Sequence, residues 1–449
     1  MGREPLDIGQ ARNFIAENGI RTVIAAGIDQ GGILRGKRYT TGYFLDAAAK
    51  GFNMPWSLLN TGPMDEAAPG VMETGIPDVK AVPDLSTLRV ANWEEKTAVV
   101  LMDWRWADGS PCPLCPRSEL KRHVAAARAA GFRERFALEL EFYVLPLPAE
   151  KLRQGAWAEV PVASRDPHCY SIYEGSYLEP LYARLREDFP DAIEGGGPEW
   201  GCGQFEINLR AGDALAMADT VALFKTAVKQ RAAALGMSAT FMAKVHETFS
   251  GNSGHIHQSL LDAASGKPLF YDAGAADRMS PLMRHYMAGQ LAALIPTTLC
   301  FAPYVNSYKR FREDSLAGIM KGWGVDNRTA GLRAITASEG SCRVEHRIGG
   351  ADLNPYVAFS ALLGAGLKGV ADKTPLPPPL AGNAYHIADV ERVPRSLSEA
   401  VRKADSDPLM RQILTPAFVD NLIVVANLEL AAFETTVTDL ERRRCYERV

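Results

Sequence analysis

The chain has 449 residues, of which 47% are hydrophobic and 23% charged, a composition typical of a globular protein. Its 49 Lys and Arg against 53 Asp and Glu give a formal charge of −4, which argues against general electrostatic binding of nucleic acid. The longest apolar stretch, 292–305, contains two prolines and is too short to cross a membrane. The N-terminal sequence lacks a hydrophobic signal core, so we expect a cytoplasmic protein with no nucleic-acid or membrane partner.

The first part of the chain is predicted to form a short helix followed by strands and loops. The helix is expected over 11–18, and an unbroken apolar run predicts a buried strand over 22–28. Gly and Pro interrupt the stretch 31–88, which we expect to form loops with short strands. A second apolar run predicts a buried strand over 98–103. The proline-rich segment 111–116 then indicates a connection between two domains.

The longer predicted helices lie in the rest of the chain. Gly131 and Gly236 follow two of them as stop signals, while Thr415 and Pro416 are typical of a helix start. The expected helices span 117–130, 213–235, 283–294, 355–368 and 416–444. Helices and strands are mixed without a regular βαβ rhythm, so the pattern favours an α+β fold over a doubly wound sheet.

The chain has seven cysteines, too few for a disulfide framework. Cys112 and Cys115 form a CxxC pair, but a structural zinc site needs a second pair, and the other cysteines are scattered singly. Prolines around Cys112 also disfavour a redox helix that begins there. We interpret the two residues as incidental thiols in a proline-rich loop.

Four short strand-like segments place polar residues at alternating positions, with apolar residues between them. Alternate residues of a strand share one face, so each segment presents a polar face. The segments are 136–144 with Glu139 and Glu141, 204–209 with Gln204, Glu206 and Asn208, 255–259 with His255, His257 and Ser259, and 343–347 with Arg343, Glu345 and Arg347.

One such segment alone is typical of a half-exposed strand, but four together indicate a site. Carboxylates on adjacent strands repel unless cations lie between them. Oxygen ligands with one or two imidazoles suit Mg²⁺ or Mn²⁺, and arginines suit an anionic substrate. The chain has no GxxxxGK[ST] loop. The pattern therefore predicts a metal-dependent phosphoryl-transfer site on an antiparallel sheet, without a P-loop.

Over nearly its whole length the chain resembles the glutamine synthetase family. The matching stretches are 29–37, 83–89, 139–142, 241–244, 253–260, 306–310, Asn327-Arg328 with Arg333, 343–347 and 354–356. The resemblance implies a small N-terminal β-grasp domain over 1–110 and a catalytic domain binding ATP and glutamate over 111–449, with a curved antiparallel sheet. It also implies a ring-stacked homo-oligomer, a dodecamer, in which a neighbour's N-terminal domain completes each site.

The same resemblance assigns roles to individual residues. It implies two or more Mg²⁺ or Mn²⁺ ions per site and ATP as co-substrate. One ion would be held by Glu141, Glu199 and Glu206, and the second by Glu139, His255 and Glu345. The positions that match ATP contacts are His257, Ser259, Arg328, Arg333 and Arg343, and Arg328 is the catalytic arginine that reaches the transferred phosphate. Those that match glutamate contacts are Gly251, Asn252, Arg310 and Arg347.

The implied reaction is an ATP-dependent ligation through γ-glutamyl phosphate, but the amine site departs from true glutamine synthetases. Those enzymes carry an ammonium-binding Glu six residues after the arginine that matches Arg310, where this chain has Leu316. Their FDGSS segment is also absent. Glu313, Asp314 or Asp65 would substitute only if the loops shift. Leu316 instead suits the carbon tail of an organic amine.

The sequence therefore predicts a ligase for a primary organic amine: an alkylamine, a polyamine or an aromatic amine. The pattern is similar to the γ-glutamylpolyamine and γ-glutamylalkylamide or -anilide synthetase branch, notably 323–328 and 344–351. The alternatives are an ammonia-dependent glutamine synthetase and a non-catalytic structural or regulatory member, which would have eroded ligands. Trp56, Trp200 and Trp323 flank the site motifs and fit either the rim of an amine site or ordinary core.

Overall fold

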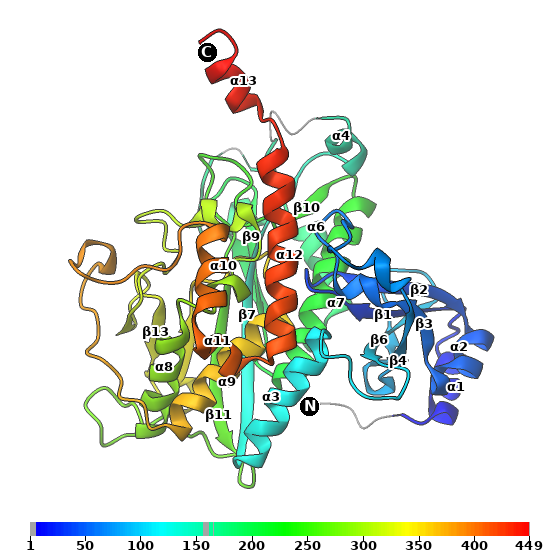
Figure 1. The fold of residues 1–449 in the computed structure, drawn as a ribbon, viewed down its shortest axis with the longest axis horizontal. Helices are drawn as coiled ribbons and strands as arrows, with labels where there is room; N and C mark the ends of the chain where they lie inside the picture. Colours follow the sequence, from blue (N-terminus) through cyan, green and yellow to red (C-terminus); the bar gives the residue numbers. More distant parts are fainter. Residues whose placement is uncertain (1–5, 156–160, 165, 449) are drawn as a thin grey trace.

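The computed structural model describes residues 6–155, 161–164 and 166–448, which fold around two β-sheets (Figure 1). The N-terminal sheet has six strands in the order β2-β1-β6-β4-β3, with β5 paired to β6. Its strands are β1 (Thr22–Ile28), β2 (Leu34–Thr40), β3 (Phe52–Pro55), β4 (Asp78–Pro83), β5 (Arg89–Val90) and β6 (Thr97–Arg105). The expected strands over 22–28 and 98–103 are thus confirmed.

The second sheet has eight strands, in the order β12-β13-β14-β11-β7-β9-β8, with β10 paired to β7. All pairs are antiparallel except β12 with β13. The strands are β7 (Phe132–Leu145), β8 (Ile193–Pro198), β9 (Gln204–Leu209), β10 (Ser238–Thr240), β11 (Gly254–Asp262), β12 (Trp323–Val325), β13 (Leu332–Ile335) and β14 (Arg343–His346). The four segments with polar faces therefore lie on four adjacent strands, and the expected α+β fold is confirmed.

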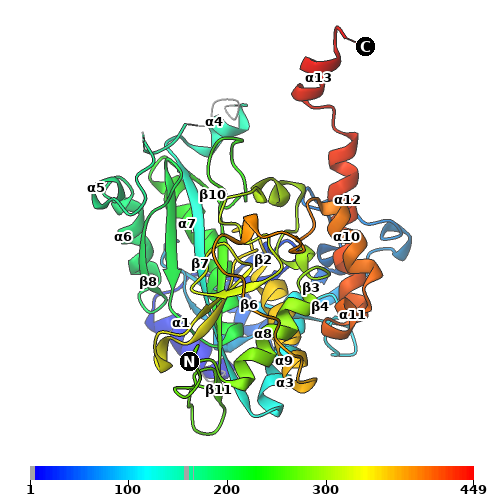
Figure 2. The same ribbon diagram turned by 90° about the vertical axis from the view of Figure 1, so that its left-hand side faces the viewer.

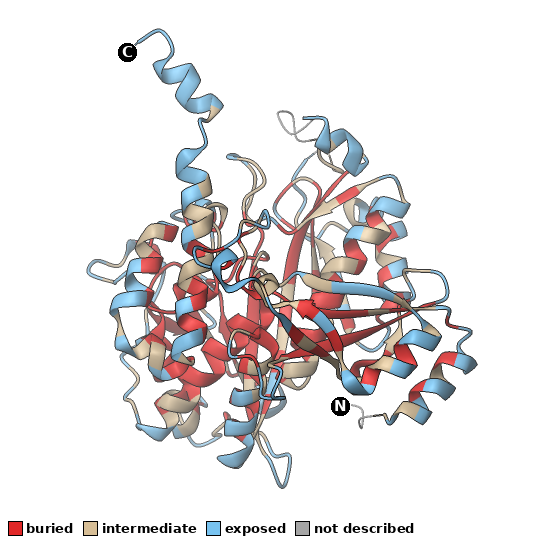
Figure 3. Cartoon of the chain, turned by 45° about the vertical axis from the view of Figure 1, so that its right-hand side comes forward, coloured by how far each residue is buried: buried red, intermediate tan, exposed pale blue. Residues whose placement is uncertain are grey.

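Helices cover the apolar face of this second sheet and form the rest of the core (Figure 2). The helices that follow the N-terminal sheet are α3 (Pro116–Ala129), α4 (Ala149–Arg153), α5 (Ile172–Gly175), α6 (Glu179–Asp188), α7 (Ala214–Ala234), α8 (Pro281–Ala293), α9 (Pro355–Ala371), α10 (Leu397–Ser406), α11 (Pro408–Ile413), α12 (Pro416–Thr435) and α13 (Asp439–Cys445). Of these, α4, α5 and α13 contribute no buried residue. Both α3 and α7 pack on β7, and α9 packs on α3, α7 and α8. Along β7, Phe136, Leu138 and Leu140 are fully buried in this core, so the alternate positions face the other way. Buried residues gather at the centre of the molecule, whereas the C-terminal end is exposed (Figure 3).

Strand β6 joins the two halves because both of its faces are buried. Val99 and Leu101 belong to the large core of the second sheet. Val100 and Met102 belong to the smaller core of the N-terminal sheet. A strand covered on both sides needs a continuous apolar run, which explains the run that the sequence shows here.

A buried arginine in α3 also ties the N-terminal sheet to the catalytic helices. Arg117 donates to Asp103 of β6 at 2.7 Å and lies 2.9 Å from a carboxylate oxygen of Asp84. Two of its nitrogens donate to the two oxygens of Asp219 in α7, each at 2.9 Å. The predicted domain boundary at 110/111 falls between β6 and α3 and stays a prediction.

The CxxC pair packs beside this junction. Cys112 and Cys115 are free, buried thiols, and burial raises the pKa of Cys112 to about 12. The Cys115 sulfur accepts a hydrogen bond from the backbone N–H of Ser118 at 3.4 Å and so caps the start of α3. Among the described residues, neither thiol belongs to a metal-ligating cluster.

Two expectations about secondary structure were wrong. The stretch 31–88 contains a helix, α2 (Thr41–Ala47), in addition to loops and strands; the N-terminal helix α1 (Ile8–Glu17) was expected. The predicted single helix over 416–444 is broken into α12 and α13. Thr438 starts α13 through a capping box with Glu441, which stabilises a new helix start in place of a continued helix.

The C-terminal helices project from the body of the protein in two views at right angles (Figures 1 and 2). By length and composition alone, the segment Pro416–Cys445 is long and apolar enough to cross a membrane, and 28% of its most apolar window is buried. Its first half packs on α10 through residues such as Phe418 and Leu422. A single such helix is weak support for a membrane span, because core helices pass the same test. The predicted lack of a membrane partner stays a prediction.

Candidate active site

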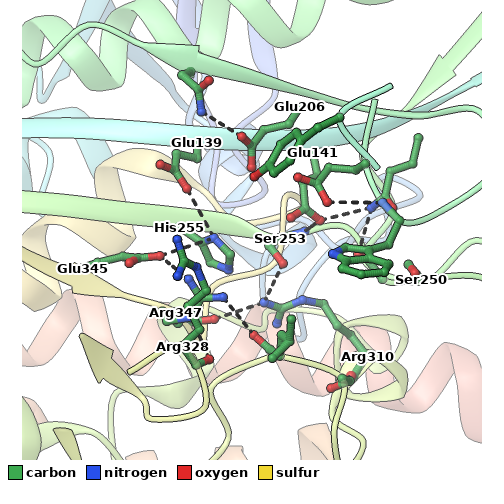
Figure 4. Close-up of a pocket in the computed structure, with 18 of the residues that line it drawn as sticks. Glu139, Glu141, Glu206, Ser250, Ser253, His255, Arg310, Arg328, Glu345 and Arg347 are labelled. Atoms are coloured by element: carbon green, nitrogen blue, oxygen red, sulfur yellow. Dashed lines mark hydrogen bonds and ion pairs between the residues drawn. The ribbon is translucent and has the colours of Figure 1, made fainter. Parts of the chain in front are cut away.

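A cavity of about 990 Å³ lies over the polar face of the second sheet (Figure 4). The pairing of neighbouring strands brings the residues of this polar face together. Glu139 of β7 lies opposite His255 of β11, and Glu141 lies opposite Glu206 of β9. Glu345 of β14 pairs with His257 on one side and with Arg333 of β13 on the other. Figure 4 shows Glu139, Glu141 and Glu206 on one side of the pocket and Glu345 beside Arg347 on the other.

Three carboxylates form the first charged group. Oxygens of Glu141, Glu199 and Glu206 lie within 4.8 Å of one another. Burial and the charge of Glu199 raise the pKa of Glu141 to about 7. Burial together with Glu139 and Glu141 raises the pKa of Glu206 to about 8. Carboxylates this close need a cation to stay ionised together, so the group fits a divalent ion with oxygen ligands.

The second group combines two carboxylates with two imidazoles. His255 Nδ1 lies 3.5 Å from Glu139 and 3.6 Å from Glu345. His257 Nε2 lies 2.9 Å from Glu139, and the set whose ligand atoms lie within 4.8 Å of one another is Glu139, His257 and Glu345. Burial would raise the pKa of Glu139, but hydrogen bonds from the two histidines hold it below its ordinary value.

The hydrogen bonds distinguish the two histidines. Arg343 Nε donates to His257 Nδ1 at 3.0 Å, so the ring proton of a neutral His257 is on Nε2, toward Glu139. A nitrogen that carries a proton cannot hold an ion. His255 Nε2 and His257 Nε2 are both buried without a hydrogen-bond partner among the described residues, and burial lowers the pKa of His255 to about 4. The Arg343 contact is therefore what separates the two rings, and His255 as a ligand of the second ion stays a prediction.

Glu345 is the centre of the arginine side of the pocket. It is fully buried, accepts from Arg333 Nη1 at 2.8 Å and pairs with Arg347 Nη1. Burial would raise its pKa, but Arg347 and the histidines hold it at about 2. Arg347 also donates to the carbonyl of Arg328 at 3.1 Å and to that of Leu316 at 3.3 Å. The loop that carries Leu316 is thus tied to the same arginine.

A smaller cavity of about 330 Å³ adjoins the first, and Glu139, Glu194 and Asn208 line both. His257, Ser259 and Arg343, expected to contact ATP, line the smaller cavity. Arg328 and Arg333, from the same expected set, line the larger one. The expected ATP contacts are thus divided between two cavities that share lining residues, and their roles stay predictions.

The residues expected to contact glutamate do not all reach the cavity. Gly251, Arg310 and Arg347 line it. Arg310 is buried and donates to the carbonyls of Ile348 at 2.8 Å and Arg347 at 3.1 Å. Asn252 is fully buried and is not a lining residue; its side chain donates to the carbonyl of Met242 at 2.8 Å.

One polar residue at the site had no predicted role. Gln204 Nε2 lies 3.1 Å from Glu141, 3.0 Å from the carbonyl of Gly251 and 2.9 Å from Asn252 Oδ1. It therefore connects a carboxylate of the first group to the Gly251 loop. Its position on the same strand face as Glu206 was the only sequence signal. Of Trp56, Trp200 and Trp323, Trp200 is the one that lines the cavity among the described residues, with 61% of its surface exposed.

Residues 113–445 match the glutamine synthetase catalytic domain. The chain belongs to the glutamine synthetase family. The expected resemblance is confirmed, as is the expected class of enzyme, an ATP-dependent glutamate–amine ligase of glutamine synthetase type. Glutamine synthetase family enzymes use divalent metals and ATP, which agrees with the two carboxylate groups of the pocket.

Several relatives within the glutamine synthetase family have names that include an organic amine or its amide. The chain is 37% identical to a gamma-glutamylethanolamide synthetase of Streptomyces coelicolor, over 99% of this chain and 96% of that protein. It is 35% identical to a glutamate–isopropylamine ligase of a Pseudomonas species, over 97% of each. Ligand-free GmaS has a similar structure, with a TM-score of 0.85, 26% identity and coverage of 97% of this chain and 98% of GmaS. GmaS has also been solved with ADP.

Proposed function

We propose that this enzyme joins the γ-carboxylate of L-glutamate to a primary organic amine, in preference to ammonium, through a γ-glutamyl phosphate intermediate. The observation that carries the proposal is Leu316, which lines the large cavity at the position where true glutamine synthetases bind ammonium with a Glu. An isobutyl side chain offers a contact to carbon and none to a cation. The names of two relatives, which include ethanolamide and isopropylamine, support the same substrate class.

In this proposal, different arginines and carboxylates act on glutamate, on ATP and on the divalent ions. Arg310 and Arg347, with the Gly251–Asn252 segment, bind glutamate, and Arg328 acts on the transferred phosphate. Glu141, Glu199 and Glu206 would hold one divalent ion and Glu139, His255 and Glu345 a second, and the ions would neutralise charge on the phosphates. His257, Ser259, Arg333 and Arg343 bind ATP. The γ-carboxylate attacks the γ-phosphorus, and the amine then displaces phosphate.

Of the three carboxylates named above as substitutes for an ammonium-binding Glu, two form ion pairs elsewhere. Glu313 forms an ion pair with Arg392 at 2.7 Å, and Asp65 forms one with Arg35 at 2.7 Å. Neither lines the cavity. An amine, by contrast, gains about 0.8 kcal/mol for each CH₂ that it buries, so two or three carbons against Leu316 yield roughly a tenfold gain or more. This comparison favours an alkylamine, a polyamine or an aromatic amine over ammonium.

The proposal is tested by measuring phosphate release with glutamate, ATP and Mg²⁺ against ammonium, methylamine, ethanolamine, isopropylamine, putrescine and aniline. We expect kcat/KM for at least one organic amine to exceed that for ammonium by about tenfold or more. The variant Leu316→Glu should weaken use of that amine and improve use of ammonium. Wild type that prefers ammonium over every amine in the panel would refute the proposal and favour a plain glutamine synthetase. No turnover with any of them would favour a non-catalytic role.

The assembly is a second part of the proposal. We infer a ring-stacked homo-oligomer, a dodecamer, in the cytoplasm. The exposed apolar residues on the C-terminal helices, including Phe433 and Leu440, support burial between subunits. Light scattering coupled to size exclusion gives the mass in solution, and a monomer at micromolar concentration would contradict it.

A further inference from the structure

The loop that carries Leu316 brings a second feature to the cavity wall. Asp314, Ser315 and Leu316 are consecutive residues that all line the large cavity. Asp314 has a φ of 54° and Leu316 a φ of 58°, both in the left-handed region that a side chain other than glycine adopts at a cost of roughly 1–3 kcal/mol. The loop therefore turns sharply at two points, and contacts elsewhere must hold it in that shape.

Those contacts come mainly from the segment 383–392. Asn383 Nδ2 donates to Asp314 Oδ1 at 3.0 Å, and His386 Nε2 lies 3.6 Å from Asp314 Oδ2. Arg392 pairs with the adjacent Glu313. These groups fix the direction of the Asp314 carboxylate without neutralising it through a lysine or arginine.

The charge balance of the cavity sets Asp314 apart from the other lining carboxylates. Among the described residues, the others are Glu139, Glu141, Glu194, Glu199, Glu206 and Glu345. Glu194 lies 3.7 Å from Arg210, and the remaining five form the two groups that fit metal ions. Asp314 is thus the lining carboxylate that has neither an arginine partner nor a place among the proposed metal ligands.

We propose that Asp314 is the residue that receives the proton of the incoming amine; this rests on the proposed function. An alkylamine arrives as R–NH₃⁺, and its nitrogen loses two protons when it becomes an amide N–H. The first passes to the Asp314 carboxylate and frees the lone pair, which attacks the carbonyl carbon of γ-glutamyl phosphate. The C–O bond to phosphate then breaks, and the departing phosphate takes the second proton. Leu316, two residues away, contacts the carbon tail.

The test uses the dependence of the rate on amine basicity. Ethylamine and trifluoroethylamine share a carbon skeleton, but at neutral pH the first is protonated and the second is mostly free base. Asp314→Asn should lower kcat/KM for ethylamine about 100-fold or more, the usual range for loss of a general base. It should change kcat/KM for trifluoroethylamine and hydroxylamine little. Glutamate-dependent ADP formation without amine should persist, because phosphoryl transfer does not use Asp314.

Glu313→Gln is the matched control, since Glu313 is the adjacent carboxylate and does not line the cavity. This variant should not change kcat/KM for one of the two amines more than for the other. The proposal would be overturned if Asp314→Asn lowered kcat/KM equally for basic and weakly basic amines. It would also be overturned if kcat/KM fell for neither. If wild type uses ammonium alone, the proposed function fails. The Asp314 proposal is then decided by the same variant with ammonium against hydroxylamine. If Asp314→Asn melts early, Asp314→Ser is used in its place.

Discussion

Glu345 carries more of the site's charge contacts than any neighbouring side chain described above. It is buried between Arg333 and Arg347, and His255 lies 3.6 Å away. We expect Glu345→Gln to abolish glutamate-dependent ADP formation, because an amide keeps the volume but removes the negative charge that both arginines face. Some stability is also lost, since a buried charge network is broken. Turnover near that of wild type at saturating Mg²⁺ would rule out the role; thermal melting separates loss of activity from unfolding.

At this scale the sequence predicted which side chains meet, but not how each is held. The spacing in 255–259 places both imidazoles on one face, yet only the Arg343 contact distinguishes His257 from His255. For a similar reason, the sequence pattern assigned Gln204 no role of its own and placed Asp314 at the amine site only if the loops shift. Gln204 is one amide in a polar strand face, and Asp314 reaches the cavity through a loop conformation that no periodicity encodes.

Among the elements, the pairing of β7 with β9 makes the free energy of unfolding depend on pH. This register puts Glu141 opposite Glu206, whose pKa values are raised to about 7 and about 8 from 4.5. Between pH 4.5 and 8 the folded state thus keeps protons that the unfolded chain releases, so the free energy of unfolding falls as pH rises through this window.

We therefore expect the Tm of EDTA-treated protein to fall between about pH 5 and pH 8.5, and the stabilisation by Mg²⁺ to grow over the same range. Glu206→Gln should flatten the metal-free profile. Scanning calorimetry at a series of pH values checks both. A metal-free Tm that rises with pH across this range would contradict the interpretation of this carboxylate group.

Elements with strong local signals were predicted well, and those decided by a few contacts were not. The long helices α7 and α9 have extended apolar patterns, and their predicted ends lie within a few residues of the observed ones. The break between α12 and α13 rests on one capping interaction at Thr438, which a continuous apolar pattern concealed. The pattern of a single strand fixes which face is buried but not which residues of the neighbouring strand lie opposite, because a shift by two residues keeps the same face inward.

For the whole molecule, Arg117 is the buried connection between the N-terminal sheet and the catalytic helices. Arg117→Met should lower the free energy of unfolding by roughly 3–5 kcal/mol, because it leaves the carboxylates of Asp84, Asp103 and Asp219 near one another without their arginine. Urea melting measures this loss. As a control, Arg186→Met removes an exposed pair with Glu179 and should cost less than about 1 kcal/mol. Equal losses in the two variants would contradict the role.

The order of strands in the second sheet has a consequence for synthesis of the chain. Strand β14 lies next to β11, and both follow β7 by more than a hundred residues, so Glu139 and Glu345 meet only after residue 346 has left the ribosome. A chain that ends before β14 contains the whole first group, Glu141, Glu199 and Glu206, but lacks Glu345, which the second group needs. The proposed function uses both groups, so we expect such an incomplete chain not to consume ATP.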